Sequence, residues 1–310
     1  QPCALTRISA SGGCTFCSAG GSGDFAAGSA GADFGADADF GAGADLGAGA
    51  SFGTGFGAGF GAGSDPDIRS QIEQAKALVA SKYKGNSFIA YFQSFTNTYA
   101  PVDYLRKIFT EAIEHPDIVC LSVATRPDCL DNEVIGLLSE LNRIKPVWIE
   151  LGLQTMHEST AQLIRRGYPL EVFTDAVSRL NAAGIEVIVH MIIGLPGETE
   201  TQMYETASFL SHMHIQGIKL QLLHVLKGTD LADEYERGAF QTLSSDEYIN
   251  ILGNIIELLP KELVVHRLTG DGPKKLLISP LWSADKKKVL AAISRSFAAR
   301  GIEQGKRYIP

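Results

Sequence analysis

Three cysteines lie close together near the start of the chain. Cys14 and Cys17 belong to the segment Gly-Gly-Cys-Thr-Phe-Cys, and Cys3 precedes them. A C-x-x-C pair beside a third cysteine is typical of a metal or redox site. Three thiolates suit a cubane iron–sulfur cluster, because a cluster of four irons held by three cysteines keeps one iron available for another ligand. Such an iron is what a radical enzyme needs to bind S-adenosylmethionine (SAM) and cleave it by one-electron reduction.

Two other chemistries fit the same cysteines. A structural zinc site needs a fourth protein ligand, and after Cys17 neither a histidine nor a cysteine occurs before His115. A thioredoxin-like redox pair needs only Cys14 and Cys17 and gives Cys3 no role. The cysteines alone therefore leave all three interpretations open, and the rest of the chain has to distinguish them.

The composition indicates a globular protein of a reducing compartment. The 310 residues exceed one average domain but suit a single α/β barrel, and 45% of them are hydrophobic, which is enough for a large core. No apolar run reaches the roughly 18 residues of a membrane span, and no secretory signal precedes Cys3. Cys120 and Cys129 have no disulfide-framework spacing and are expected to be inert buried thiols. We expect the cytoplasm, or the plastid stroma in a eukaryote, and no membrane association.

The charge is unevenly distributed along the chain. Residues 1–68 hold one arginine and seven aspartates, a balance of −6, although the whole chain carries −8. Residues 274–310 hold nine lysines and arginines against Asp285 and Glu303, a balance of +7. An acidic total therefore does not exclude a nucleic-acid partner for this basic segment. A solvated helix face explains the same charges equally well.

Four segments follow from the sequence pattern. Sixteen of the 33 glycines fall between residues 20 and 63, among Gly/Ala/Asp/Phe repeats. Such a segment cannot offset the backbone entropy of ordering, so we predict that it is disordered. The predicted segments are a cluster-binding loop at 1–19, a low-complexity disordered insertion at 20–64, a barrel at 65–260 and a basic extension at 261–310.

Beyond residue 65, short apolar strands alternate with amphipathic helices. This alternation predicts a parallel sheet connected by helical crossovers. No dinucleotide-binding glycine motif follows a strand, so a full or partial α/β barrel fits better than a doubly wound nucleotide fold. The predicted strands are 87–92, 118–123, 147–152, 186–193 and 218–223, and the predicted helices are 67–82, 102–115, 132–143, 158–165, 170–183, 199–214 and 244–259.

Polar side chains occur on or directly after each predicted strand. The carboxyl ends of barrel strands meet at one rim, which is where barrel enzymes carry their chemistry. Any one of these residues could be a turn residue with satisfied hydrogen bonds, but five at one rim are hard to explain by packing. In chain order they are Gln93, Arg126, Gln154, His190 and His224.

Together these motifs resemble the radical SAM superfamily. The cysteine loop, Thr-Arg-Pro-Asp, Glu-Leu-Gly-Leu-Gln-Thr and Gly-Leu-Pro-Gly-Glu resemble the group shared by the Elongator catalytic subunit and oxygen-independent coproporphyrinogen oxidase. Tyr-Phe-Gln-Ser-Phe-Thr-Asn-Thr-Tyr, Leu-Leu-His-Val-Leu-Lys-Gly-Thr and His-Arg-Leu-Thr-Gly-Asp resemble the bacterial and plastid YhcC/YtqA-like family within it. The resemblance runs from about Gln71 to the C-terminus, plus the cysteine loop. It implies an α/β fold, a partial (β/α)6 TIM-like barrel with a C-terminal extension, whose first strand is expected to be missing from this chain.

The resemblance implies a role for the cysteine loop. Cys3, Cys14 and Cys17 would hold the 4Fe–4S cluster, and Phe16 would lie against the adenine of SAM. Family members follow the first cysteine with Pro-Asn-Arg-Asp-Gly, whereas Cys3 is followed by Ala-Leu-Thr-Arg-Ile. Whether Cys3 is the third ligand therefore stays open.

The resemblance also implies residues that bind SAM. Gln93 would meet the methionyl amino group, and Gln154 and His190 would reach the ribose. Arg166 would pair with the methionyl carboxylate, a task that suits a planar guanidinium. The alternative for Arg166 is a surface charge, which is the expectation for its neighbour Arg165.

The implied reaction is reductive cleavage of SAM to a 5′-deoxyadenosyl radical, followed by hydrogen-atom abstraction from a substrate. For this family the implied substrate is tRNA, at a wobble-uridine side chain such as carboxymethylaminomethyl-uridine, with phosphate contacts from the basic segment. Flavodoxin or ferredoxin would donate the electron. A small-molecule substrate and a non-catalytic metal-binding barrel scaffold remain alternatives. The residues expected on the substrate side are Arg126, His224, His266, Arg267 and Asp271.

Overall fold

The computed structural model describes residues 15–16, 49–52, 67–81, 83–93, 96–270 and 272–310. It divides the chain into two compact units, each assembled from separate stretches of sequence. The first unit contains Gln1–Gly13, Gly20–Leu151 and Val172–Val187, and the second contains Cys14–Ala19, Gly152–Glu171 and Ile188–Pro310.

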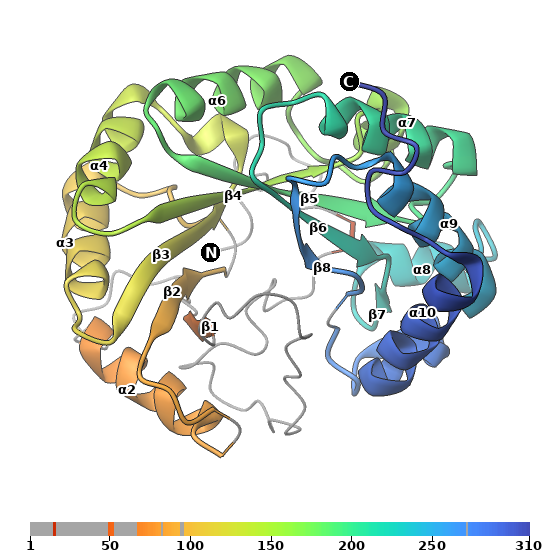
Figure 1. Ribbon diagram of the computed structural model, residues 1–310, viewed down its shortest axis with the longest axis horizontal. Helices are drawn as coiled ribbons and strands as arrows, with labels where there is room; N and C mark the ends of the chain where they lie inside the picture. The colour runs from red at the N-terminus through yellow and green to blue at the C-terminus, as the bar shows by residue number, and fades with distance from the viewer. Residues whose placement is uncertain (1–14, 17–48, 53–66, 82, 94–95, 271) are drawn as a thin grey trace. The chain divides into compact units, whose positions relative to one another are not determined.

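The first unit is built on parallel strands in the order β1-β2-β3-β4. Helices form the connections, because a parallel pair cannot be joined by a tight turn (Figure 1). Seven of the eight residues of β3 are buried, as expected for a strand covered on both faces. The elements are β1 (Gly49–Phe52), α2 (Ile68–Val79), β2 (Phe88–Phe92), α3 (Val102–Ile113), β3 (Ile118–Thr125), the 3-10 turn η2 (Pro127–Cys129), α4 (Asn132–Asn142), β4 (Val147–Gln154, its last three residues in the second unit) and α6 (Leu170–Ala182).

The second unit contains parallel strands in the order β5-β6-β8 and a separate antiparallel ribbon of β7 with β9. Thr199 and Ser244 form capping boxes with Gln202 and Glu247, which satisfy the first backbone N–H groups of α7 and α9. The elements are α5 (Glu158–Leu163), β5 (Glu186–Ile193), α7 (Glu200–Ser211), β6 (Gly217–Leu222), β7 (Val225–Leu226), α8 (Asp230–Glu236), α9 (Ser245–Leu258), β8 (Val264–Arg267), β9 (Leu277–Ser279), the 3-10 turn η3 (Leu281–Ala284) and α10 (Lys286–Arg300).

The low-complexity segment differs from its prediction at one place. Residues Gly49–Phe52 form β1, which pairs in parallel with β2. These four residues, inside the segment predicted to be disordered, thus form a strand at the β2 edge of the sheet. The physical reason is that a β-ladder needs only backbone N–H and C=O groups, which a Gly/Ala-rich segment offers to an edge strand as well as any other. The rest of residues 20–64 lies outside the described part of the chain.

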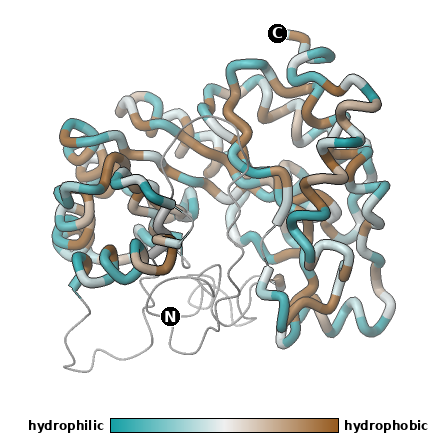
Figure 2. The backbone as a smooth tube through the Cα atoms, turned by 60° about the horizontal axis from the view of Figure 1, so that its bottom comes forward, coloured by the Kyte–Doolittle hydropathy of each residue, from teal (hydrophilic) through white to brown (hydrophobic). Residues whose placement is uncertain are grey.

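The basic extension forms regular secondary structure. Its first strand, β8, pairs in parallel with β6, and its helix α10 packs against α9. Along the tube in Figure 2, hydrophobic and hydrophilic stretches alternate within the helices, as expected where one helix face is buried. In the described residues, none of the helices is both long and apolar enough to cross a bilayer.

Candidate functional site

The cysteine loop is anchored in the second unit through the backbone of Thr15. The Thr15 N–H donates to the carbonyl of Ile164 at 3.3 Å, and the Leu231 N–H donates to the carbonyl of Thr15 at 2.9 Å. These two bonds join the loop to the end of α5 and to the start of α8. Cys3, Cys14 and Cys17 themselves lie outside the described residues, so their cluster role stays a prediction.

Phe16 adds an apolar anchor to the same loop. Its ring packs against a buried cluster formed where β5 and β6 end and α8 begins. The loop that carries Cys14 and Cys17 is thereby held at the carboxyl ends of strands, which is where barrel enzymes place their chemistry. The cluster consists of Ile164, Ile192, Leu195, Leu223, Val225, Leu231 and Ala232.

Gln154 ends β4 in an unusual backbone conformation. Its φ is +68°, in the left-handed region that side chains other than glycine rarely adopt. A Cβ atom on Gly152 would come within 2.7 Å of the Gln154 side-chain nitrogen, so the glycine makes room for this amide. Residues held in such conformations cluster at ligand sites, where the surrounding structure compensates for the strain. The predicted contact of Gln154 with the ribose stays a prediction.

Arg166 is buried, with only 2% of its side chain exposed. Its guanidinium donates to the carbonyl of Thr155 at 2.6 Å, to that of Tyr168 at 3.0 Å and to a Glu158 carboxylate oxygen at 2.6 Å. The guanidinium also lies 4.9 Å from the centre of the Tyr168 ring. Arg166 is thus no surface charge, and it fixes the turn that follows β4. Its predicted contact with the methionyl carboxylate stays untested.

Two of the predicted histidines belong to the second unit, His190 within β5 and His224 just after β6. His190 on β5 contacts Gln221 on β6, with 3.2 Å between ring Nδ1 and the amide nitrogen. His224 follows β6, and a Cβ on Gly272 would lie 2.6 Å from its Nδ1. A Cβ on Gly270 would lie 2.9 Å from the same ring, so this glycine turn packs closely on His224. Asp271, between the two glycines, lies outside the described residues.

His266 lies at the other end of β6. A Cβ on Gly217, the first residue of β6, would come within 2.5 Å of His266 Nε2. His224 lies seven positions after Gly217, a span of roughly 23 Å in extended backbone. Arg267 is half-buried and pairs in register with Lys219 inside the strand. The amino ends of barrel strands serve stability more than chemistry, so this position favours a structural role for His266.

In the first unit, two predicted residues follow strand ends. Gln93 is half-buried directly after β2. Arg126, after β3, forms a two-point pair with Asp128, at 2.9 Å from Nε to one carboxylate oxygen and 2.5 Å from a terminal nitrogen to the other. Asn97 closes this edge by donating to the carbonyls of Phe92 and Ala124 at 3.0 and 2.8 Å. The neutralised guanidinium of Arg126 is better suited to shaping the edge than to attracting an anion.

A buried carboxylate was missed by the sequence reasoning. Glu150 on β4 is 3% exposed and accepts hydrogen bonds from the Tyr91 hydroxyl at 2.7 Å and the Ser122 hydroxyl at 2.8 Å. The available signal was an acidic residue in an apolar strand that needs a partner once it is buried. Outside the cysteine loop, burial raises the pKa of the Cys120 thiol to about 12, which agrees with the inert role expected for it.

Glu198 connects the Gly-Leu-Pro-Gly-Glu motif to the turn after β4. It accepts a hydrogen bond from the Thr155 hydroxyl, the neighbour of Gln154. Removal from water raises the pKa of this carboxyl group, and its bonds from Thr155 and Thr160 offset only part of that rise. Glu198 thus fixes the Gln154 turn while its ionised form carries a desolvation cost.

Changing Glu198→Gln is expected to alter the pH dependence of stability. A raised folded-state pKa gives stability that is fully present below the unfolded-state pKa of about 4.3 and lost as pH rises through the folded-state pKa. Glutamine does not titrate, so the variant should gain in stability relative to the wild type between pH 4 and pH 7. Urea unfolding at both pH values measures this, with Glu262→Gln on an exposed loop as control. If the difference in free energy of unfolding between variant and wild type is the same at both pH values, the raised pKa of Glu198 is contradicted.

Comparison with known proteins shows which families the chain matches. Residues 10–210 match the Radical SAM superfamily and residues 215–298 match the Radical_SAM C-terminal domain. The YtqA protein of Bacillus subtilis (strain 168) is 42% identical over 297 residues, 96% of this chain and 81% of YtqA. The tRNA uridine(34) acetyltransferase of Methanocaldococcus infernus is 25% identical over 163 residues, 52% of this chain and 30% of that protein.

A solved structure confirms the predicted fold class. The Elp3 protein of Methanocaldococcus infernus with an N-terminal deletion (1–46) matches with a TM-score of 0.65 at 19% identity, over 76% of this chain and 59% of that one. The α/β fold is that of the radical SAM partial barrel, as the strand–helix alternation and the motifs predicted. The chain belongs to the radical SAM superfamily and, within it, to the YhcC/YtqA-like family.

Proposed function

We propose that the protein is a radical SAM enzyme that remodels a wobble-uridine side chain of tRNA. The observation that carries the proposal is the anchoring of the cysteine loop through Thr15 in the same compact unit as Gln154 and His190. Members of the superfamily typically use SAM and a 4Fe–4S cluster. The relative that acts on tRNA uridine(34), by its name, supports the choice of substrate.

The residues around the loop fit a cluster with bound SAM. Thr15 is 2% exposed, and its hydroxyl has no hydrogen-bond partner among the residues that the structure describes. A buried hydroxyl without a hydrogen-bond partner is costly. A bound group that accepts a hydrogen bond from it would remove this cost. Cys14 and Cys17, which flank Thr15 and Phe16, would hold the cluster together with Cys3. When bound, the cluster supplies the single electron that cleaves SAM.

The chain's own residues position SAM and exclude water. Phe16 and the apolar cluster beneath it keep solvent from one side of the loop, which protects a reactive radical from side reactions. Gln154 and His190 would orient the ribose, and Gln93 would meet the methionyl amino group. Arg166 holds the turn that carries Gln154, through its bond to the Thr155 carbonyl.

Anaerobic reconstitution with iron and sulfide tests the proposal. Dithionite and SAM are added to the reconstituted protein, and 5′-deoxyadenosine is quantified with and without bulk tRNA, whose nucleosides are then analysed by mass spectrometry. We expect 5′-deoxyadenosine and a tRNA-dependent change in a modified uridine. Formation of 5′-deoxyadenosine without any change in tRNA would favour a small-molecule substrate, and no 5′-deoxyadenosine from a cluster-loaded protein would refute the radical function.

A further inference from the structure

Two hollows lie side by side in the second unit and share Leu281 and Trp282 as a common wall. The first has a volume of about 510 Å³ and the second about 670 Å³. Leu281 is 70% exposed, an unusual state for a leucine at the edge of a cavity. The two hollows therefore adjoin at η3, and we call the surface that they form together the track.

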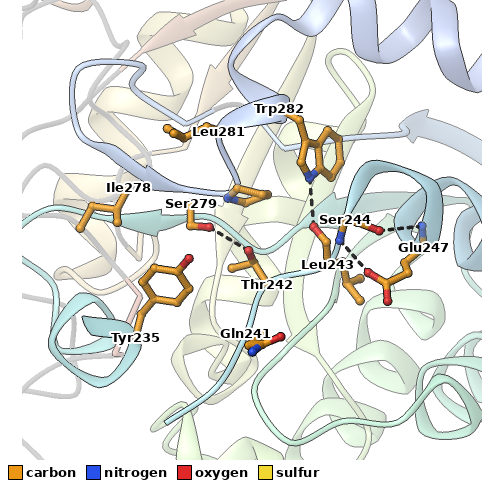
Figure 3. Close-up of a pocket in the computed structure, with 11 residues that line it drawn as sticks. Tyr235, Gln241, Thr242, Leu243, Ser244, Glu247, Ile278, Ser279, Leu281 and Trp282 are labelled. Atoms are coloured by element: carbon orange, nitrogen blue, oxygen red, sulfur yellow. Dashed lines mark hydrogen bonds between the residues drawn. The ribbon is translucent and has the colours of Figure 1, made fainter. Parts of the chain in front are cut away.

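The first hollow touches the packing that supports the cysteine loop. Tyr235 and Ile278 line it, and both also pack against the apolar cluster that holds Phe16. Figure 3 shows these two residues at one end of the hollow and Trp282 at the other. The Trp282 indole N–H donates to the carbonyl of Leu243 at 3.0 Å, which fixes the ring at the shared wall. A ligand in this hollow would therefore lie next to the elements that anchor the cluster loop.

The second hollow is basic. Lys274, Lys288 and Arg295 line it, and all three are exposed. Lys288 and Arg295 are seven residues apart on α10, which places them on one helix face about 10 Å apart along the axis. Asp285 also lines the hollow, but its carboxylate caps α10 and pairs with Lys288 at 3.2 Å.

The smaller side chains of the second hollow leave space between these cations. Ala291 and Ala292 lie on α10 between Lys288 and Arg295 and line the hollow with them. The lining thus combines an alanine surface with long basic side chains around it. This shape suits a narrow anionic chain that lies along the helix, with its charges against the basic groups.

The start of α10 combines a stabilising cap, in which Asp285 accepts a hydrogen bond from the Lys288 N–H, with a basic first turn. Three consecutive lysines, Lys286–Lys288, form its first turn, and no acidic residue lies there. Cations at a helix N-terminus oppose the helix dipole and cost roughly 0.3–1 kcal/mol each. A solvated face does not require this arrangement, whereas a polyanion site gains from it, because the dipole and the lysines add to the same positive potential.

We infer that the track formed by the two hollows binds a single-stranded stretch of RNA, with phosphates along α10 and a base against Trp282 and Leu281. Backbone phosphates pair with lysine and arginine, and unstacked bases stack on exposed aromatic and apolar side chains. That the RNA is also the substrate rests on the proposed function, but binding to the track does not. The end of the track lined by Tyr235 and Ile278 would then receive the nucleotide next to the bound segment.

Charge reversal on α10 tests the inference. The variant Lys288→Glu with Arg295→Glu is compared with Lys107→Glu with Arg143→Glu, an equal charge change at exposed residues of α3 and the end of α4. Binding of a fluorescein-labelled tRNA transcript is measured by anisotropy from low to high salt. We expect the α10 variant to bind RNA at least about tenfold more weakly than the wild type, and the slope of log affinity against log salt concentration to be smaller by about 1–2. The control should bind RNA with an affinity close to that of the wild type.

Three outcomes would overturn the inference. RNA binding by the α10 variant as tight as that of the wild type would show that the track does not bind RNA. Weaker binding of the variant to phosphatidylglycerol vesicles with unchanged binding to RNA would show the same. Equal loss in both variants would show only a general charge effect. SAM cleavage is assayed in parallel with and without RNA. Wild-type protein that binds RNA through α10 but forms no 5′-deoxyadenosine would refute the proposed function and leave the RNA track standing.

Discussion

Replacing Arg166 with alanine is expected to lower the free energy of unfolding by about 3–5 kcal/mol. The substitution removes a buried cation that donates to the carbonyls of Thr155 and Tyr168 and to Glu158. Each carbonyl that loses a buried donor costs about 1–3 kcal/mol, and the space once filled by the side chain adds a cavity. Urea unfolding of the cluster-free protein measures the loss without interference from bound SAM.

The neighbouring arginine provides a matched control. Arg165 pairs with Asp230, and a third of its side chain is exposed. Exposed pairs of this kind contribute about 0–1 kcal/mol, so Arg165→Ala should change stability little. An equally small loss for Arg166→Ala would show that the contacts of Arg166 do not stabilise the fold. Arg166→Lys keeps the positive charge but lacks the planar guanidinium that can bind a carboxylate through two hydrogen bonds. Weaker SAM binding by a folded Arg166→Lys protein would support the predicted contact with the methionyl carboxylate.

Replacing Cys14 or Cys17 with serine is expected to abolish cluster binding and formation of 5′-deoxyadenosine. Both residues flank the pair Thr15–Phe16, which is held by the two backbone bonds of Thr15 and the packing of Phe16. Two remaining thiolates cannot hold a four-iron cluster in the way that three can. Iron content, visible absorption of the reconstituted protein and 5′-deoxyadenosine yield are measured together.

Cys129→Ser is the control, because this half-buried thiol lies outside the loop. It should retain iron and activity. Cys3→Ser decides the third ligand. Loss of the cluster in this variant would place Cys3 in it, and retention would require a different third ligand. Retention of the cluster in both Cys14→Ser and Cys17→Ser would contradict the cluster assignment altogether.

Most of the fold was predictable because its strands are apolar runs bounded by turns. The predicted bounds of the strand at 186–193 are those of β5, and each of the other four predicted strands overlaps an observed one. Helix α10, with 15 residues, was not predicted, because only Val289 and Ile293 of it are buried and they give little apolar periodicity. The other missed elements are short. Helix α8 and the ribbon of β7 with β9 have too few residues to give a periodic signal, and tertiary contacts such as the Leu231 bond to Thr15 stabilise them instead.

The positions of the candidate residues along the strands were predictable, and their local geometry was less so. Residues at strand ends could be named because parallel strands bring their carboxyl ends together. The left-handed backbone of Gln154 has no counterpart in the sequence, because only the packing around the residue imposes it. The burial of Arg166 was equally hidden, since arginine is usually exposed. The bond between Glu198 and Thr155 joins residues 43 positions apart, which no local pattern reports.

The anchoring of Thr15 by Leu231 has a consequence for biosynthesis. The two residues are 216 positions apart (231 − 15), so the loop leaves the ribosome long before its partner exists. At about 5–20 residues per second this delay is roughly 10–40 s. During that time the newly made Cys14 and Cys17 lack the backbone contacts that hold their loop in the finished protein. Cluster delivery to a properly formed loop therefore has to follow synthesis of α8, and the nascent thiols depend on the cell's reductants until then.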